Sequence, residues 1–288
     1  MNTTIDSAGK ILTKSLHFYK KHWEDLIRLM LGIIGLYIVA FLIGLGVTGV
    51  FAPLYFIVPA GLEVIVQQII GLCLATFVTF VVPKFVHELD QGKKPSVFEA
   101  FRFVSKHFLE YFTTTILALS LVYGGSVALI VPGIIFAVGM MLYPFIAVID
   151  GKRGMSALVT SYWQTYGNKL KIFWVLAVTG LFVFAVVLGS LVLSSTLIAI
   201  SVLAFQTMTM KVIFIAPIIV TCFLFAVFIV VPFSFIPKYI VYKEIQSKAR
   251  DVDHTFKVQK EEMFSAFIVI GFIVFMLLII SSVLAPTM

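Results

Sequence analysis

Few residues of this sequence have the types and spacing that a chemical site requires. His87, Glu88 and Asp90 lie within four positions of one another, and imidazole and carboxylate groups are ligand types that a divalent cation accepts. Their spacing differs from the His-Glu-x-x-His pattern, which places two histidines on one helix face. A solvated polar loop is the simpler interpretation, so the sequence predicts no bound metal and no cofactor.

A second pattern is glycine-rich. Gly44-Leu45-Gly46-Val47-Thr48-Gly49 has the spacing of a dinucleotide-binding fingerprint, which needs a strand before it and a helix after it. Here the segment lies inside a long apolar run. Small residues at such spacing let membrane helices approach closely, and this is the interpretation that the context favours. The same prediction applies to Gly124/Ala128, Gly133/Ala137 and Ala185/Gly189.

Three polar residues, His22, His107 and Asn168, each follow an aromatic-rich segment at the same spacing. One hypothesis groups their side chains around a common axis as an anion or headgroup site. The alternative is that each ends an amphipathic helix and reaches water at the membrane surface. Nearby basic residues complete the candidate set for binding lipid or a partner: Lys20, Lys21, Lys93, Lys94, Arg102, Lys106, Lys152 and Arg153.

The elements that carry these residues are predicted to be membrane helices. The chain is 61% hydrophobic and 12% charged, with a mean hydropathy of +1.10, whereas a soluble domain is about 45–50% apolar and about 25% charged. We therefore expect an all-α membrane protein that forms a single polytopic domain over residues 1–288. Seven runs approach the roughly 20 residues that cross about 30 Å of hydrocarbon: Leu29–Phe51, Val64–Pro83, Tyr111–Val131, Gly133–Ile149, Ile172–Ala204, Val212–Ile236 and Met263–Leu284. The fourth is short, and the fifth is too long for one straight span.

The charged residues predict the orientation. Alternating the loops places 20 of the 21 Lys and Arg residues on one side, together with 13 of the 14 acids. The positive-inside rule makes that side cytoplasmic, with the N-terminus inside and the C-terminus outside. The net charge of +7 therefore reflects topology rather than nucleic-acid binding, and the predicted location is the cell (plasma or inner) membrane.

The chain also contains a predicted internal repeat. Ser15–Trp23, Ala100–Phe108 and Ser161–Lys169 each begin with a small residue, continue with aromatics, and have His or Asn seven positions on. We expect each to belong to a surface helix, at about 10–22, 95–108 and 155–168, that precedes a helical hairpin. The second helix of each hairpin carries a proline near its inner end, Pro83, Pro144 or Pro237. The repeat units are about 8–92, 93–151 and 152–248, and the span at 263–284 is additional.

Part of this repeat resembles a known family. The motifs are Val131-Pro132-Gly133, Tyr143–Gly151, Gly154–Leu158, Ser161-Tyr162-Trp163 and Gly167-Asn168-Lys169. They resemble the glycerophosphoryl diester phosphodiesterase membrane-domain-like family of prokaryotic integral membrane proteins, over about residues 8–248 and most specifically 131–170. The resemblance implies a membrane fold. In those phosphodiesterases a separate soluble barrel performs catalysis, so no such activity is carried over.

The predicted membrane interior narrows the function. Ionisable side chains inside a bilayer usually mark proton relays or substrate paths, and the predicted spans hold none away from their outer ends. We therefore expect a non-enzymatic protein that organises membrane lipid, anionic lipid in particular, or a protein partner in the membrane through its basic amphipathic helices. The alternatives are a transporter or channel for an uncharged or amphipathic solute, and a membrane enzyme acting on lipid headgroups.

Overall fold

The computed structural model describes residues 5–51, 62–128, 130–204, 208–248, 264, 267–274 and 276–277. Within these residues the chain is helical and has no strand. The helices are α1 (Ala8–Lys21), α2 (Trp23–Phe51), α3 (Leu62–Asp90), α4 (Val97–Lys106), α5 (Phe108–Ala128), α6 (Ile130–Gly139), α7 (Tyr143–Ile149), α8 (Met155–Gln164), α9 (Lys169–Ala204) and α10 (Met208–Lys248). The predicted all-α class is confirmed for the described part of the chain.

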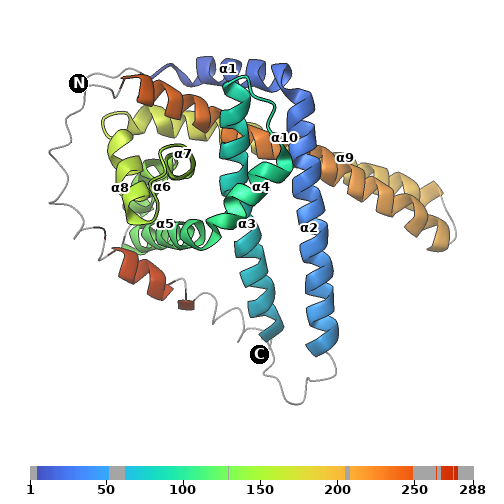
Figure 1. Cartoon of the computed structure of the whole chain (residues 1–288). Coiled ribbons are helices and arrows are strands. Elements are labelled where there is room, and N and C mark those ends of the chain that lie inside the picture. Colours follow the sequence, from blue (N-terminus) through green and yellow to red (C-terminus); the bar gives the residue numbers. More distant parts are fainter. Residues whose placement is uncertain are drawn as a thin grey trace.

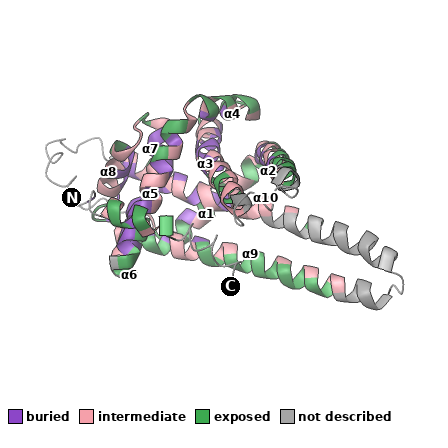
Figure 2. Cartoon of the chain, turned by 90° about the horizontal axis from the view of Figure 1, so that it is seen from below, coloured by how far each residue is buried: buried purple, intermediate pink, exposed green. Residues whose placement is uncertain are grey.

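Two long hairpins dominate the shape (Figure 1). The α2–α3 hairpin runs downward beneath α1, and the α9–α10 hairpin leaves the same region in a different direction, to the right. At 1.5 Å per residue, the 36 residues of α9 span about 54 Å in one continuous helix. The far part of α9 is largely exposed (Figure 2), as expected for a surface that lipid covers.

The hairpins meet at a hub, by which we mean the buried residues within three proline-containing segments, 80–89 of α3, 141–148 around α7 and 236–245 of α10. Phe80, Phe85 and Phe145 are almost completely buried there. The helices α1, α4 and α8 cover the hub with one face each, through residues such as Ile11, Val104 and Ala157. A smaller cluster joins α5, α6 and α8 to Phe264 and Phe267.

The predicted run Gly133–Ile149 corresponds to a segment long and apolar enough to cross a membrane, but it is interrupted by a turn at residues 140–142, between α6 and α7. Pro144 follows the break, and proline lacks the backbone donor that a continuing helix needs. Ser161 of α8 compensates. Its hydroxyl donates to the Gly139 carbonyl at 2.7 Å and accepts from the Leu142 N–H at 3.2 Å. Broken membrane helices persist only where such partners satisfy the freed backbone groups.

Helix α3, by contrast, continues through Pro83, and α10 continues through Pro237. Helix α3 ends at a turn in which Gly92 has a φ of 73°. This is the left-handed conformation that glycine adopts most readily. The Gly92 N–H donates back to the Leu89 carbonyl at 3.0 Å, which satisfies one of the last free carbonyls of the helix.

Four segments of the described chain are long and apolar enough to cross a membrane: Trp23–Gly46, Val64–Asp90, Ile130–Ile149 and Lys169–Ile198. They correspond to four of the seven predicted runs and indicate an all-α membrane protein. The run Tyr111–Val131 is largely α5, and Val212–Ile236 lies within α10. Only half of Met263–Leu284 lies within the described residues, so the count of seven spans stays a prediction.

Among the described residues, the close helix contacts that the sequence predicts at glycines form at Gly124 and Gly133 but not at Gly46. A Cβ added to Gly44 or Gly46 would meet no atom of the described residues within 4 Å, so an alanine would fit at either position. Gly124 instead packs directly against the backbone of Phe267 and Gly271. Gly133 packs in the same way against Ser126 of α5.

Candidate functional site

The predicted basic set divides into two groups in the structure. Six side chains are exposed and form no hydrogen bond or ion pair with any other described residue: Lys20, Lys21, Lys93, Lys94, Arg102 and Lys106. We call these six residues the free rim. They belong to α1, α4 and the segment before α4. Because their ammonium and guanidinium groups have no partner among the described residues, they are available to an external anion.

Lys152 and Arg153 belong to the second group, since both are half-buried and bonded within the chain. The Lys152 ammonium donates to the Thr160 hydroxyl at 3.3 Å. The Arg153 guanidinium pairs with Glu110 and lies 5.5 Å from the centre of the Tyr111 ring. Arg153 therefore joins the turn before α8 to the first residues of α5, which is a structural role.

The three polar residues at equivalent positions occupy helix starts. The carbonyls of His22, His107 and Asn168 each accept a hydrogen bond from the N–H four residues on, at 3.1, 3.1 and 3.0 Å. His22 packs against Phe18, with ring centres 4.7 Å apart, and His107 packs against Phe103, at 5.7 Å. Asn168 is buried. His22 and His107 thus each pack against an aromatic ring of the helix that precedes them, and the hypothesis of a common anion site stays a prediction.

His22 stands at the junction of α1 and α2. Partial burial, and secondarily the neighbouring Lys21, lower the pKa of this imidazole. His22 is therefore neutral near pH 7, and it adds no positive charge to the free rim there.

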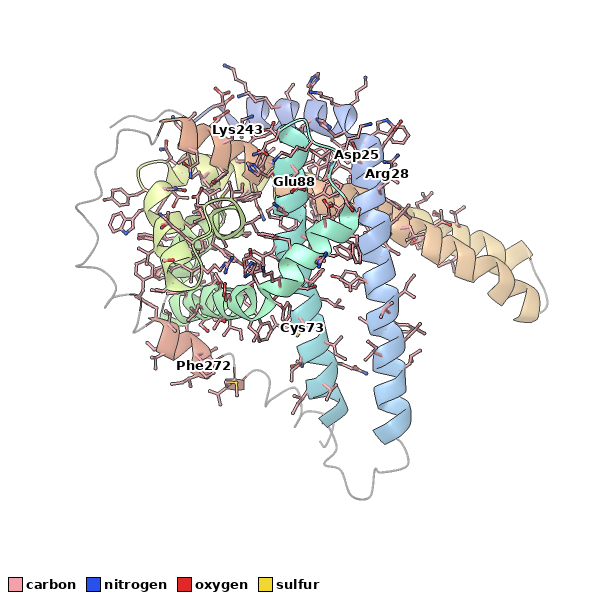
Figure 3. The ribbon with its side chains drawn as sticks, in the orientation of Figure 1. Asp25, Arg28, Cys73, Glu88, Lys243 and Phe272 are labelled. Atoms are coloured by element: carbon pink, nitrogen blue, oxygen red, sulfur yellow. The ribbon has the colours of Figure 1, made fainter. Side chains whose placement is uncertain are left out.

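The end of α10 forms three polar contacts that together we call the clasp. In the first, the Tyr239 hydroxyl donates to Asp90 at 3.0 Å, and the Lys243 ammonium donates to the same carboxylate oxygen at 2.6 Å. Asp90 is the last residue of α3, so this contact joins α10 to α3. Lys243 and Glu88 lie at the same end of the molecule as Asp25 and Arg28 (Figure 3).

His87 extends this contact by one step. Tyr239 uses its only proton on Asp90, so its oxygen accepts from the His87 Nδ1–H at 3.3 Å. The other ring nitrogen, Nε2, then accepts from the Gln91 amide at 2.7 Å. The directions of these bonds define a neutral imidazole with its proton on Nδ1.

The second contact joins α10 to the end of α7. The Tyr242 hydroxyl donates to Asp150 at 2.7 Å, and the Gln246 amide donates to the same carboxylate at 3.0 Å. Burial, followed by the Asp150 carboxylate, raises the pKa of Tyr242. The hydroxyl therefore keeps its proton and serves as a donor rather than as an acid.

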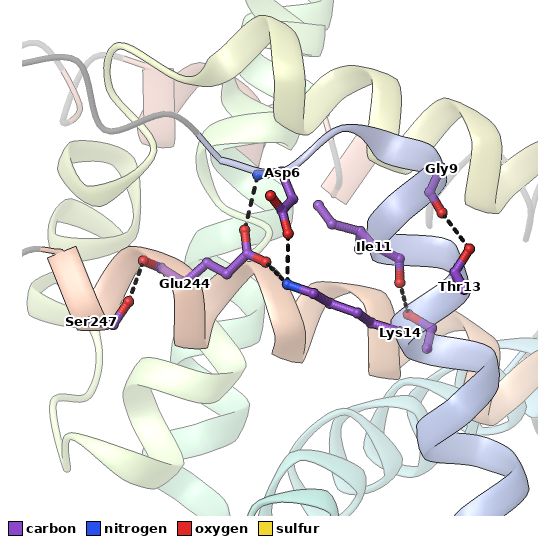
Figure 4. A network of polar contacts seen from close by, with 8 residues as sticks. Asp6, Gly9, Ile11, Thr13, Lys14, Glu244 and Ser247 are labelled. Atoms are coloured by element: carbon purple, nitrogen blue, oxygen red, sulfur yellow. Dashed lines mark hydrogen bonds and ion pairs between the residues drawn. The ribbon is translucent and has the colours of Figure 1, made fainter.

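The third contact joins α10 to the N-terminal segment (Figure 4). The Lys14 ammonium lies 2.6 Å from Glu244 and 2.7 Å from Asp6, and the Asp6 N–H donates to Glu244 at 3.1 Å. Hydrogen bonds to both carboxylates raise the pKa of Lys14, and the bond to Lys14 lowers the pKa of Asp6. The clasp thus connects α10 to the end of α3, to the end of α7 and to α1 with the segment before it.

Within the described residues, no group of three His, Cys, Asp or Glu side chains is placed to hold a metal ion. Glu88 pairs with Lys84 at 3.0 Å instead, while His87 and Asp90 bond to Tyr239. The sequence analysis missed the partners on α10. Tyr239, Tyr242 and Gln246 recur at intervals of three and four, which places them on one helix face, and this was the signal that could have identified them.

Comparison with known proteins adds no relative, because no family model, curated protein or solved structure matches the chain significantly. The resemblance to the phosphodiesterase membrane-domain-like family therefore stays a prediction.

Proposed function

We propose that the protein is a non-enzymatic, multi-pass protein of the cell membrane that binds anionic lipid at its cytoplasmic face through the free rim. The observation that carries this proposal is the division of its cations. Of the eight basic residues predicted to bind, Lys152 and Arg153 are bonded to a hydroxyl and a carboxylate of the chain, whereas the six of the free rim form no hydrogen bond or ion pair with any described residue. Each basic residue near an anionic leaflet contributes about 1 kcal/mol of attraction.

The directions of the hairpins support one placement in the membrane. Membrane helices tilt by up to about 40° from the normal, and the α2–α3 and α9–α10 hairpins diverge from the hub (Figures 1 and 2). Both can cross one flat bilayer only if the normal lies between their directions. This arrangement sets the hub and clasp on one side, and the positive-inside rule assigns that side to the cytoplasm.

The proposed threefold repeat gains support from equivalent burial and backbone geometry. The residue seven positions before each of His22, His107 and Asn168 is buried: Ser15, Ala100 and Ser161. The residue four positions after each is buried as well: Leu26, Tyr111 and Ile172. The backbone angles of His22 (φ −115°, ψ 23°) and His107 (φ −117°, ψ 20°) nearly coincide. Parallel repeats of this kind are related by an axis along the membrane normal.

The proposal is tested by the lipid that the purified full-length protein retains in mixed micelles of phosphatidylglycerol and phosphatidylcholine. The parent protein should enrich phosphatidylglycerol, and exchange of all six free-rim cations for Gln should abolish the enrichment. The control is Lys152→Gln/Arg153→Gln, which should lower thermal stability and leave the preference largely intact. A parent protein that binds both lipids equally refutes the proposal.

A further inference from the structure

The outer face of α4 carries exposed apolar residues beside exposed cations. Phe98 is 75% exposed and Leu109, just beyond the helix, is 78% exposed. Residues at intervals of three and four share a helix face, so Phe98, Arg102 and Lys106 lie along one side of α4. Leu109 belongs to the first turn of α5. The opposite face is occupied by the protein itself, since Ala100 and Val104 are buried in the hub.

Helix α4 contacts α2 and α3 at positions inside their predicted membrane spans. Val97 contacts Gly32 of α2, and Phe101 packs edge-on against Phe77 of α3 at 5.3 Å. Gly32 lies three residues inside the predicted span that begins at Leu29, and Phe77 lies six residues before Pro83. Helix α4 therefore sits at the level where the spans enter the hydrocarbon, on the outside of the body (Figure 2).

An open depression of about 770 Å³ lies on this outer face, lined by Glu99, Arg102, Phe103, Ser105 and Lys106. Arg102 and Lys106 have no partner within the described part of the chain. Lys84 lies 4.6 Å from the centre of the Phe103 ring and is neutralised by Glu88. With Glu99 included, the lining carries a net charge of +1, because two cations face one carboxylate.

From these features we infer that the outer face of α4 faces the bilayer and holds the phosphodiester of one anionic phospholipid between Arg102 and Lys106. Phe98 and Leu109 lie in the acyl-chain boundary on either side. A guanidinium binds two phosphate oxygens at once, and an ammonium supplies a second point of attachment. The net charge of +1 matches a singly charged phosphodiester. This inference rests on the proposed function and assigns one specific site within the free rim.

The first test measures the depth of α4. A nitroxide is attached at Phe98→Cys in a Cys73→Ser/Cys222→Ser background, and a Lys20→Cys label serves as the comparison. In reconstituted bilayers, oxygen concentrates in lipid and a nickel chelate in water. The label at position 98 should be relaxed mainly by oxygen, and the label at position 20 mainly by the chelate. Equal chelate access at both sites overturns the inference, as does a position-98 label that neither reagent reaches, because a protein would then cover the face.

The second test separates the site from the rim. Arg102→Gln/Lys106→Gln and Lys20→Gln/Lys21→Gln remove the same charge from two exposed surfaces. The first variant should lose about 30-fold in phosphatidylglycerol affinity, because it removes two cations that each contribute about 1 kcal/mol, and the second much less. Equal losses overturn the α4 site while leaving the proposed function standing, whereas a parent protein without preference overturns both. Displacement of the lipid by millimolar inorganic phosphate shows a site for free phosphate and overturns the assignment to lipid.

Discussion

Replacement of Gly32 by alanine tests how α4 docks on α2. A Cβ at this position would lie 2.6 Å from Val97 Cγ1 and 3.5 Å from Phe101 Cζ. The first distance is well below normal contact, so the valine methyl must move. Valine is β-branched and has little rotamer freedom. Helix α4 itself must therefore shift away from α2, which weakens its contact with the hub.

The sign of the effect is diagnostic. In a helix interior, Gly→Ala alone stabilises by about 0.5–1 kcal/mol, whereas overpacking costs about 1–3 kcal/mol. We expect Gly32→Ala to lower the free energy of unfolding by about 0.5–2 kcal/mol. Gly35 lies one turn further along α2 and has no atom within 4 Å of an added Cβ. Gly35→Ala is thus the matched control and should be neutral or stabilising.

Thermal unfolding in detergent, followed by circular dichroism, provides the measurement. The Val97→Ala exchange removes the clashing methyl, so Gly32→Ala/Val97→Ala should be more stable than the two separate effects predict by addition. Additive effects, or a Gly32→Ala protein as stable as the Gly35→Ala control, would refute the docking of α4 at this glycine.

Three further predictions concern the last helix, the clasp and its dependence on pH. Gly124→Ala would place a methyl group against the backbone carbonyl of Phe267. Because backbone cannot move aside as a flexible side chain can, the rate of hydrogen exchange at residues 267–274 should rise more than it would after a substitution whose clash a side chain can relieve. Tyr242→Phe removes the hydrogen bond to Asp150 and should lower the free energy of unfolding by about 1 kcal/mol. Adding Asp150→Asn to this variant should lower it little further. Tyr37 is exposed, so Tyr37→Phe is the neutral control. The pKa of Lys14 is raised and that of Asp6 lowered. The contact between Lys14 and Asp6 should therefore persist at neutral pH, weaken as pH falls below 3.8, and weaken again as pH rises above 10.5. Hydrogen exchange of the α1 amides measures this weakening. Amides that stay equally protected from exchange at both pH extremes would refute the prediction.

The hydropathy pattern predicted most of the helices, because a bilayer leaves few alternatives to a helix for an apolar run of about 20 residues. The helices expected at 10–22, 95–108 and 155–168 are α1, α4 and α8, with ends shifted by a few residues. The periodicity of their aromatic and basic residues was sufficient to predict that these three helices exist. The break between α6 and α7 was not predictable from Pro144 alone, since Pro83 occurs in a continuous helix. What differs is Ser161, a partner distant in sequence that bonds to the exposed backbone.

The candidate site was predicted less completely. Basic residues mark a cytoplasmic surface, but a sequence does not show which of them find carboxylates in the folded chain. Arg153 meets Glu110 across 43 positions, and Lys14 meets Glu244 across 230. Both pairs depend on how helices that are distant in the sequence pack together. The six cations of the free rim can be told apart from the cations that stabilise the fold only when these partners are known.

The measurement that tests the account most directly is the side of the membrane on which the rim lies. Single cysteines at Lys20, Lys93 and Lys106, introduced into a Cys73→Ser/Cys222→Ser background, can be treated with a membrane-impermeant maleimide in right-side-out and inverted vesicles. The account predicts that all three react only in inverted vesicles, where the cytoplasmic face is exposed. Reaction of any of the three in intact right-side-out vesicles would contradict a single basic surface at the cytoplasmic leaflet.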